Sequence, residues 1–124
     1  MREFTDLERA VLNAICDSHS GIANPLRELL ATAQPSERDN TGHGFYTSFE
    51  VDKIAPPLDL PERMLGGPNV EVSIGGETLL MGFVLWLGGG YPNCLEGFQY
   101  GTPEGGIDLK AFDLHGVRWL RLMS

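Results

Sequence analysis

One stretch constrains the fold more than any other: residues 79–100, LLMGFVLWLGGGYPNCLEGFQY. Its first nine residues are almost continuously apolar, which is typical of a strand buried on both faces of a sheet. Glycines at positions 88–90 supply the positive φ angles of a tight turn, and Pro92 marks the return of the chain. The stretch therefore predicts a β-hairpin at the centre of an antiparallel sheet.

The length of the turn sets the register of this hairpin. A loop of two or four residues places Leu85 opposite Cys94 and Phe83 opposite Glu96, whereas a loop of three residues shifts every pair by one. In the first register, Glu96 lies on the same face as Met81 and Phe83. We therefore expect a carboxylate among apolar side chains on that face.

On the opposite face, the same register brings two glycines, Gly82 and Gly97, together and leaves a gap in the side-chain layer. A helical pair, a second subunit or a ligand could fill this gap. We expect the helical pair, with a subunit interface as the alternative, because two short helices cannot cover both apolar faces of a wide sheet. The side chains flanking the gap are Leu80, Val84, Trp86 and Leu95.

Two short helices are expected before the sheet. Residues 5–8, TDLE, form a capping box, and apolar residues recur behind it at helical spacing. This helix should end near His19, with Gly21 as its left-handed cap. Residues 24–25, Asn-Pro, mark the start of the second helix, which Pro35 ends.

Alternation predicts further strands. Residues 45–52 alternate apolar and polar side chains after a bend at Gly42–Gly44, and residues 70–74 form a short strand that a Gly75-Gly76 turn joins to the hairpin. This turn places Val72 opposite Leu79 and Val70 opposite Met81.

The remaining segments are less regular. Residues 54–68 form a proline- and glycine-rich connection that ends in a turn at residues 66–69, and the tail, residues 107–123, contains one or two strands around Phe112, Leu114 and a bulge at Gly116. The prediction is one α+β domain over residues 1–124, in which a helical hairpin precedes a bent antiparallel sheet of about five strands, in the form of a half-barrel.

Composition excludes several classes of protein. Seventeen acidic and nine basic side chains give a net charge of −8, which argues against nucleic acid as a partner. No apolar run approaches the length of a membrane span, and the N-terminus is too polar for a secretory signal. Cys16 and Cys94 form no metal-ligand spacing and are expected to be small buried thiols in a reducing cytoplasm.

Four segments resemble a group of small bacterial proteins of uncharacterised function. They are NTGHGFYTSFEV, MLGGPNVEV, MGFVLWLGGGY and LEGFQYG, and the resemblance covers residues 5–101. It implies an N-terminal helical pair followed by a hairpin, and it brings no established activity, catalytic residue or cofactor.

The candidate site consists of Glu96 and His43. His43 shares the side of Phe45 in the alternating strand, so a half-barrel could bring it close to Glu96 near its mouth. Such a pair could act as a general acid and base or anchor a small ligand in an apolar pocket. Alternatively, Glu96 accepts hydrogen bonds from backbone amides or Arg38 and stabilises the sheet. The other candidate neighbours are Arg38, Asn40, Tyr46 and Tyr100.

Three functional hypotheses follow. The first is a cytoplasmic binding protein, homodimeric, that associates with a protein or a small apolar ligand and carries no cofactor or metal. The second is an enzyme that uses Glu96 and His43, although the sequence has no recognised nucleotide, zinc or nucleophile motif. The third is an acidic, immunity-type inhibitor of a basic protein.

Overall fold

The computed structural model describes residues 3–100 and 116–123. Within them, helices α1 (Asp6–Ser18) and α2 (Ala23–Ala31) come first, and a six-stranded antiparallel sheet follows. This confirms the predicted α+β class and the order of its parts. Across the sheet, the strands are β1 (Gln34–Asn40), β2 (Gly44–Glu50), β5 (Tyr91–Gln99), β4 (Glu77–Gly88), β3 (Met64–Ile74) and β6 (Arg118–Met123).

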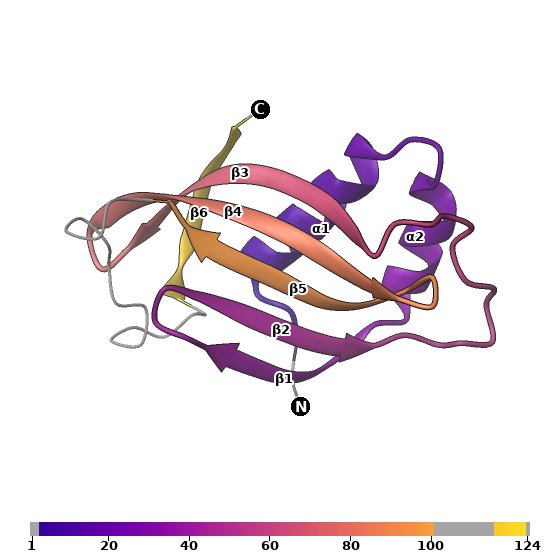
Figure 1. Ribbon diagram of the computed structural model, residues 1–124. Helices are drawn as coiled ribbons and strands as arrows, with labels where there is room; N and C mark the ends of the chain where they lie inside the picture. The colour runs from indigo at the N-terminus through magenta and orange to yellow at the C-terminus, as the bar shows by residue number, and fades with distance from the viewer. Residues whose placement is uncertain (1–2, 101–115, 124) are drawn as a thin grey trace.

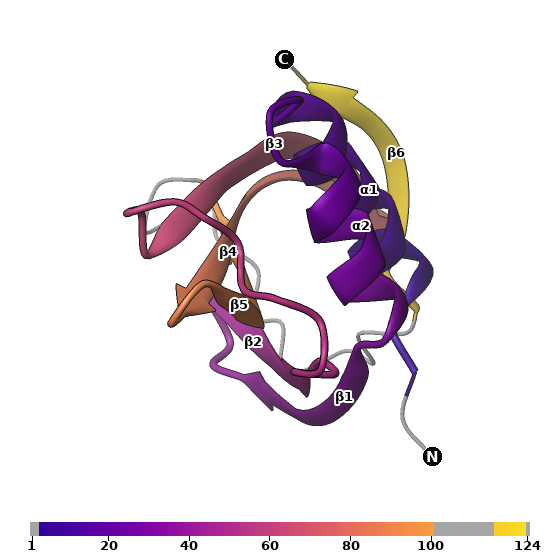
Figure 2. The ribbon, with the colours of Figure 1, turned by 90° about the vertical axis from the view of Figure 1, so that its right-hand side faces the viewer.

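The sheet forms one layer and the two helices form the other. Figure 1 shows α1 and α2 behind the strands. In Figure 2 the sheet curls around both helices, from β6 at one side to β1 at the other. The helices therefore cover the concave side, here called the inner face, and the convex side is called the outer face. Buried side chains of the inner face include Phe45, Phe49, Val70, Val72, Met81, Phe83, Leu85 and Leu95, which pack against Leu7, Val11, Ile15, Leu26 and Leu29 of the helices.

The start of α1 is as predicted, but two helix caps differ. Thr5 and Glu8 form the capping box. Gly21 does not cap α1, since the C-cap is His19 and Gly21 has no positive φ. The second helix begins at Ala23, before the predicted Asn24 cap, and its N-cap residue makes no side-chain hydrogen bond.

The turn of the central hairpin has one of the two lengths expected for the preferred register, but that register is wrong. Gly89 and Gly90 form a two-residue turn with φ of 58° and 85°. A bulge at Asn93 then places an extra residue on β5, so that Leu87 faces Pro92 while Trp86 faces Cys94. Because Pro92 has no backbone N–H, it cannot donate to a regular ladder here.

The bulge changes the face of Glu96. Leu85 pairs with Leu95 and Val84 pairs with Glu96. These are the pairs of the alternative register, the one that a three-residue loop would have given without a bulge. The predicted pairs Leu85–Cys94 and Phe83–Glu96 do not form. Glu96 therefore lies on the outer face, opposite the side assigned to it, because a shift of one residue moves every side chain to the other face.

The predicted gap between Gly82 and Gly97 is absent. The two glycines point to opposite faces, and aromatic rings fill the space over each of them. A Cβ atom on Gly82 would lie 2.7 Å from Cζ of Phe98, and one on Gly97 would lie 2.7 Å from Cε1 of Phe83. The helices cover the inner face, where Leu95 lies buried, so the prediction that they also cover Leu80, Val84 and Trp86 is wrong.

One prediction about strand β3 is confirmed and another is wrong. The Gly75-Gly76 turn joins it to β4, with Val72 opposite Leu79 and Val70 opposite Met81, as expected. The predicted turn at residues 66–69 lies inside β3 instead, where a bulge between Gly66 and Asn69 interrupts the pairing with β4. A glycine in a strand can thus mark a bulge as well as a turn.

Of the two edge strands, β6 was predicted from the sequence and β1 was not. The sequence QPSERDN of β1 was not predicted to be a strand, yet it pairs with β2 at the edge of the sheet. At the other edge, β6 confirms one strand within the tail. The expectations for Phe112 and Leu114 fall outside the described residues.

Candidate functional site

The outer face brings Glu96 together with two aromatic side chains. Glu96 is half-buried and lies opposite Tyr46 of β2. The indole N–H of Trp86 donates a hydrogen bond of 2.9 Å to Oε1 of Glu96. The negative charge of Glu96 is the main cause that raises the pKa of Tyr46, and a hydrogen bond between Tyr46 and Glu96 raises it further. The carboxylate therefore has two aromatic donors beside it.

Further aromatic residues continue this surface along the outer face. The rings of Phe98 and Tyr100 meet edge to face with centroids 5.4 Å apart. Tyr46, Trp86 and Tyr100 are 39%, 37% and 47% exposed, which is high for large aromatic side chains. Neither helix covers this face. We call this surface the outer-face patch, and its members are Tyr46, Val84, Trp86, Glu96, Phe98 and Tyr100.

His43 is not part of the patch. It is exposed in the turn between β1 and β2, where its backbone carbonyl accepts a hydrogen bond from the amide of Gln99. Glu96 pairs with Tyr46 across the sheet, and His43 lies three residues before Tyr46 in the chain. No hydrogen bond joins His43 to Glu96 in the part of the chain that the structure describes. The structure therefore does not bring the predicted acid–base pair together.

Arg38 has a different carboxylate as its partner. Its guanidinium donates from Nε to Oε2 of Glu8 at 3.0 Å and from Nη2 to Oε1 at 2.7 Å. Glu8 also accepts from the amide of Thr5 at 2.7 Å and from the hydroxyl of Thr47. Since both oxygens are hydrogen-bonded and the side chain is fully buried, this cluster stabilises the fold.

The sequence held one signal for this cluster. Thr47 is the only polar residue on the apolar side of the alternating strand, between Phe45 and Phe49. A hydroxyl on an inner face needs a buried partner, and Glu8 supplies it. Asn40 has a local role, because its Oδ1 accepts a hydrogen bond of 2.9 Å from the amide of Gly42 and so shapes the turn.

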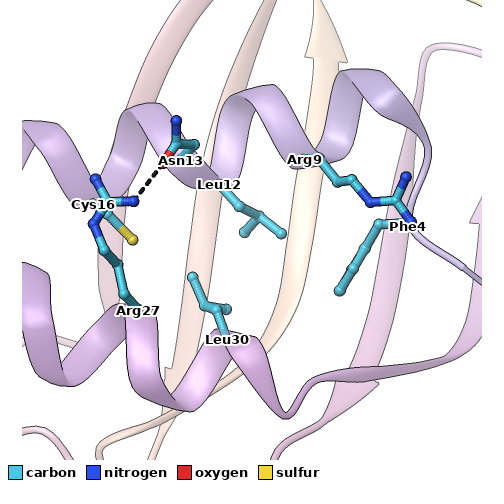
Figure 3. A pocket seen from close by; sticks show the side chains of 7 residues that line it. All are labelled: Phe4, Arg9, Leu12, Asn13, Cys16, Arg27 and Leu30. Atoms are coloured by element: carbon cyan, nitrogen blue, oxygen red, sulfur yellow. Dashed lines mark hydrogen bonds between the residues drawn. The ribbon is translucent and has the colours of Figure 1, made fainter.

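A second surface feature was not expected from the sequence. A groove of about 310 Å³ lies between α1 and α2. Figure 3 shows Leu12 and Leu30 pointing toward each other across it, with Arg9 at one end and Arg27 at the other. The other lining residues are Phe4, Asn13 and Cys16.

The Arg27 end of the groove is polar. The two terminal nitrogens of Arg27 donate to Oδ1 of Asn13 and Oδ1 of Asp17, which connects the two helices. Burial raises the pKa of the Cys16 thiol beside them, while the charge of Arg27 acts in the opposite direction. The groove thus combines an apolar floor with a guanidinium that keeps unused donors.

Among residues 3–100 and 116–123, no three His, Cys, Asp or Glu side chains are grouped so that they could hold a metal ion. Both cysteines are free, and none of the described helices is long and apolar enough to cross a membrane. Comparison with protein-family models, curated proteins and solved structures finds no match to this chain.

Proposed function

We propose that this protein acts by binding, and that two copies associate through the outer-face patch. The observation that carries the proposal is the exposure of three large aromatic side chains on one uncovered sheet face, namely Tyr46, Trp86 and Tyr100. Aromatic residues are enriched at protein interfaces because each buries a large apolar area while its polar atom keeps a hydrogen bond.

The charge of the patch favours self-association there. The whole chain has a net charge of −8, yet Glu96 is the only ionised side chain among the six patch residues. Its hydrogen bond from Trp86 and the neighbouring hydroxyl of Tyr46 reduce the cost of removing it from water. A two-fold axis would then place the same aromatic surface, with a single carboxylate, on both partners.

Sedimentation equilibrium of the purified protein tests this proposal. We expect a dimer at about 50 μM, a concentration at which micromolar association is populated. Trp86→Ser should give a monomer, because it removes the largest apolar side chain and a donor to Glu96. Ile54→Ser is the matched control, since Ile54 is 93% exposed and lies outside the patch. A monomeric wild-type protein, or an unchanged dimer with Trp86→Ser, would contradict the proposal.

The groove supports a second candidate function, the binding of an apolar chain that ends in a carboxylate. Leu12, Leu30 and Phe4 would contact the chain, and the remaining donors of Arg27 would bind the carboxylate. Octanoate at 100 times its dissociation constant would raise the free energy of unfolding by about 2.7 kcal/mol. Leu30→Trp should abolish the resulting rise in Tm by filling the groove, whereas Ile54→Trp should not.

The other hypotheses have less support. An enzyme based on Glu96 and His43 loses its geometric basis, because the two side chains are not brought together. An acidic inhibitor of a basic protein rests on the net charge of −8 alone, and capture that is unaffected by high salt would count against it. A cytoplasmic location is likewise part of the proposal, and the two free cysteines agree with a reducing compartment.

A further inference from the structure

The two edges of the sheet differ in how they are protected from pairing with another strand. An edge strand presents unpaired backbone N–H and C=O groups, and natural proteins block it with charges, proline or a bulge. The β1 edge has all three: Glu37 and Asp39 are exposed charges, Pro35 lacks an N–H, and a bulge lies between Pro35 and Glu37.

The β6 edge has two of these features, the charges of Arg118 and Arg121 and a bulge at Leu120, but it has no proline and exposes more apolar surface. Its pairing with β3 accounts for one side of the strand, and no other described strand pairs with β6. Three large apolar side chains are exposed there, with Trp119 at 42%, Leu120 at 50% and Leu122 at 44%. An apolar edge with free backbone groups is a surface onto which an extended segment can pair.

The register with β3 places the side chains of β6 on two sides. Arg118 faces Ser73 and Arg121 faces Glu71, so both arginines lie on the outer face. Trp119 faces the buried Val72 and therefore lies on the inner face, as does Leu122, which faces Val70. A bulge at Leu120 preserves this arrangement along the strand. The edge is thus cationic on one side and apolar on the other.

We propose that the edge of β6 that faces away from β3 binds an extended segment of a partner protein in which acidic and apolar side chains alternate. The backbone of the segment would add a seventh strand to the sheet. Its apolar side chains would pack beside Trp119 and Leu122, and its carboxylates would lie beside Arg118 and Arg121. Main-chain hydrogen bonds give affinity in this kind of recognition, and the alternating side chains give specificity.

Charge also separates this partner from a second copy of the same chain. Pairing two β6 strands would gather four arginines on the outer face, two from each copy, and like charges across strands are destabilising. An acidic segment would instead complement Arg118 and Arg121. Oε1 of Glu71 lies 3.5 Å from Nε of Arg121 and offsets part of the charge of that arginine. This surface is separate from the outer-face patch, so the inference does not depend on the proposed dimer.

The test uses two capped eight-residue peptides, one alternating glutamate and valine and the other alternating lysine and valine. Each is titrated into the ¹⁵N-labelled full-length protein, and amide shifts of residues 117–122 are followed. The glutamate peptide should shift these amides and bind about tenfold more tightly than the lysine peptide, as expected when two exposed ion pairs are exchanged for repulsion.

A charge reversal on the protein provides the decisive variant. Arg118→Glu with Arg121→Glu should reverse the preference, so that the lysine peptide binds more tightly. Lys53→Glu with Arg63→Glu is the matched control, because it changes the net charge equally at exposed positions outside β6 and the strand it pairs with. The wild-type comparison of the two peptides stands even if the reversal variant folds poorly.

Three results would overturn the inference. One is the absence of any shift in β6 amides with the glutamate peptide up to about 1 mM, which corresponds to less than about 4 kcal/mol of binding. Another is a peptide preference that the reversal leaves unchanged. The third is a shift of the same amides with protein concentration alone, since that would assign the edge to a second copy.

Discussion

Arg38 of β1 makes two hydrogen bonds to the fully buried Glu8 of α1, at 3.0 and 2.7 Å. The two residues are thirty positions apart, and the arginine side chain is only 16% exposed. The pair ties the helical layer to the edge of the sheet. It also gives the polar strand β1, which has little apolar surface of its own, a strong attachment to the core.

Removing the arginine should therefore be costly. Arg38→Met leaves the buried Glu8 without its cation and should lower the free energy of unfolding by about 3 kcal/mol. Urea denaturation measures the loss. Arg9→Met is the control, because Arg9 is 56% exposed and lies 3.6 Å from Asp6, a surface pair that contributes at most about 0.5 kcal/mol. Equal stability of the two variants would show that the Glu8 contact contributes little.

A second prediction concerns the titration of Tyr46. Glu96 raises the pKa of Tyr46 by its charge and by a hydrogen bond, so Glu96→Gln should lower that pKa toward the ordinary value. Because the folded-state pKa lies above the unfolded one, the resulting stability is present below about pH 10 and is lost as the pH rises through the folded pKa. The pKa of Tyr46 is measured from the phenolate absorbance as a function of pH, taken as the difference between the wild-type protein and Tyr46→Phe.

The control for this titration lies on the same strand. Glu50 is exposed on β2 and is not among the groups that shift the pKa of Tyr46. Glu50→Gln should leave the phenolate curve of Tyr46 unchanged. An identical curve for Glu96→Gln would mean that the carboxylate and the phenol do not interact in solution.

Local signals were sufficient to predict the fold class. The capping box at Thr5–Glu8 and the two glycine turns, at residues 75–76 and 89–90, each act within four residues of sequence. Their effects on the backbone follow from side-chain and φ requirements alone. The alternation of residues 45–52 likewise identified β2.

The face of Glu96 could not be predicted in the same way. The bulge at Asn93 adds one residue without changing the turn, and it inverts the face of every later side chain on β5. The true partner of Arg38 was missed for a related reason. The capping box explained Glu8 locally, and its contacts with Arg38 and Thr47 depend on tertiary packing.

The aromatic rings over Gly97 give a third prediction. A Cβ atom there would lie 2.7 Å from Cε1 of Phe83 and 3.1 Å from Cε1 of Phe45, both in the core. Gly97→Ala should therefore lower the free energy of unfolding by about 2 kcal/mol through overpacking. Gly66→Ala is the control, since nothing lies within 4 Å of its Cβ position and its φ is not positive. If thermal unfolding shifts equally in both, the close contact at Gly97 is not limiting.

The last prediction compares the second glycine of each hairpin turn. Gly76 and Gly90 have nearly the same φ, 82° and 85°. A Cβ atom on Gly76 would meet nothing within 4 Å, whereas one on Gly90 would lie 2.7 Å from the carbonyl oxygen of Leu58 and 2.7 Å from Cβ of Pro57. Alanine at either position carries the backbone cost of a left-handed residue, about 1–2 kcal/mol.

Only Gly90→Ala should add a steric cost, of about 1–3 kcal/mol, and it should also weaken the hydrogen bond from the amide of Leu58 to the carbonyl of Gly90. The difference in the free energy of unfolding between the two variants, measured by urea denaturation, isolates that cost because the backbone terms cancel. Hydrogen exchange at Leu58 should be faster in Gly90→Ala and unchanged in Gly76→Ala. Equal destabilisation with unchanged exchange would mean that the connection through Leu58 does not pack against the hairpin turn.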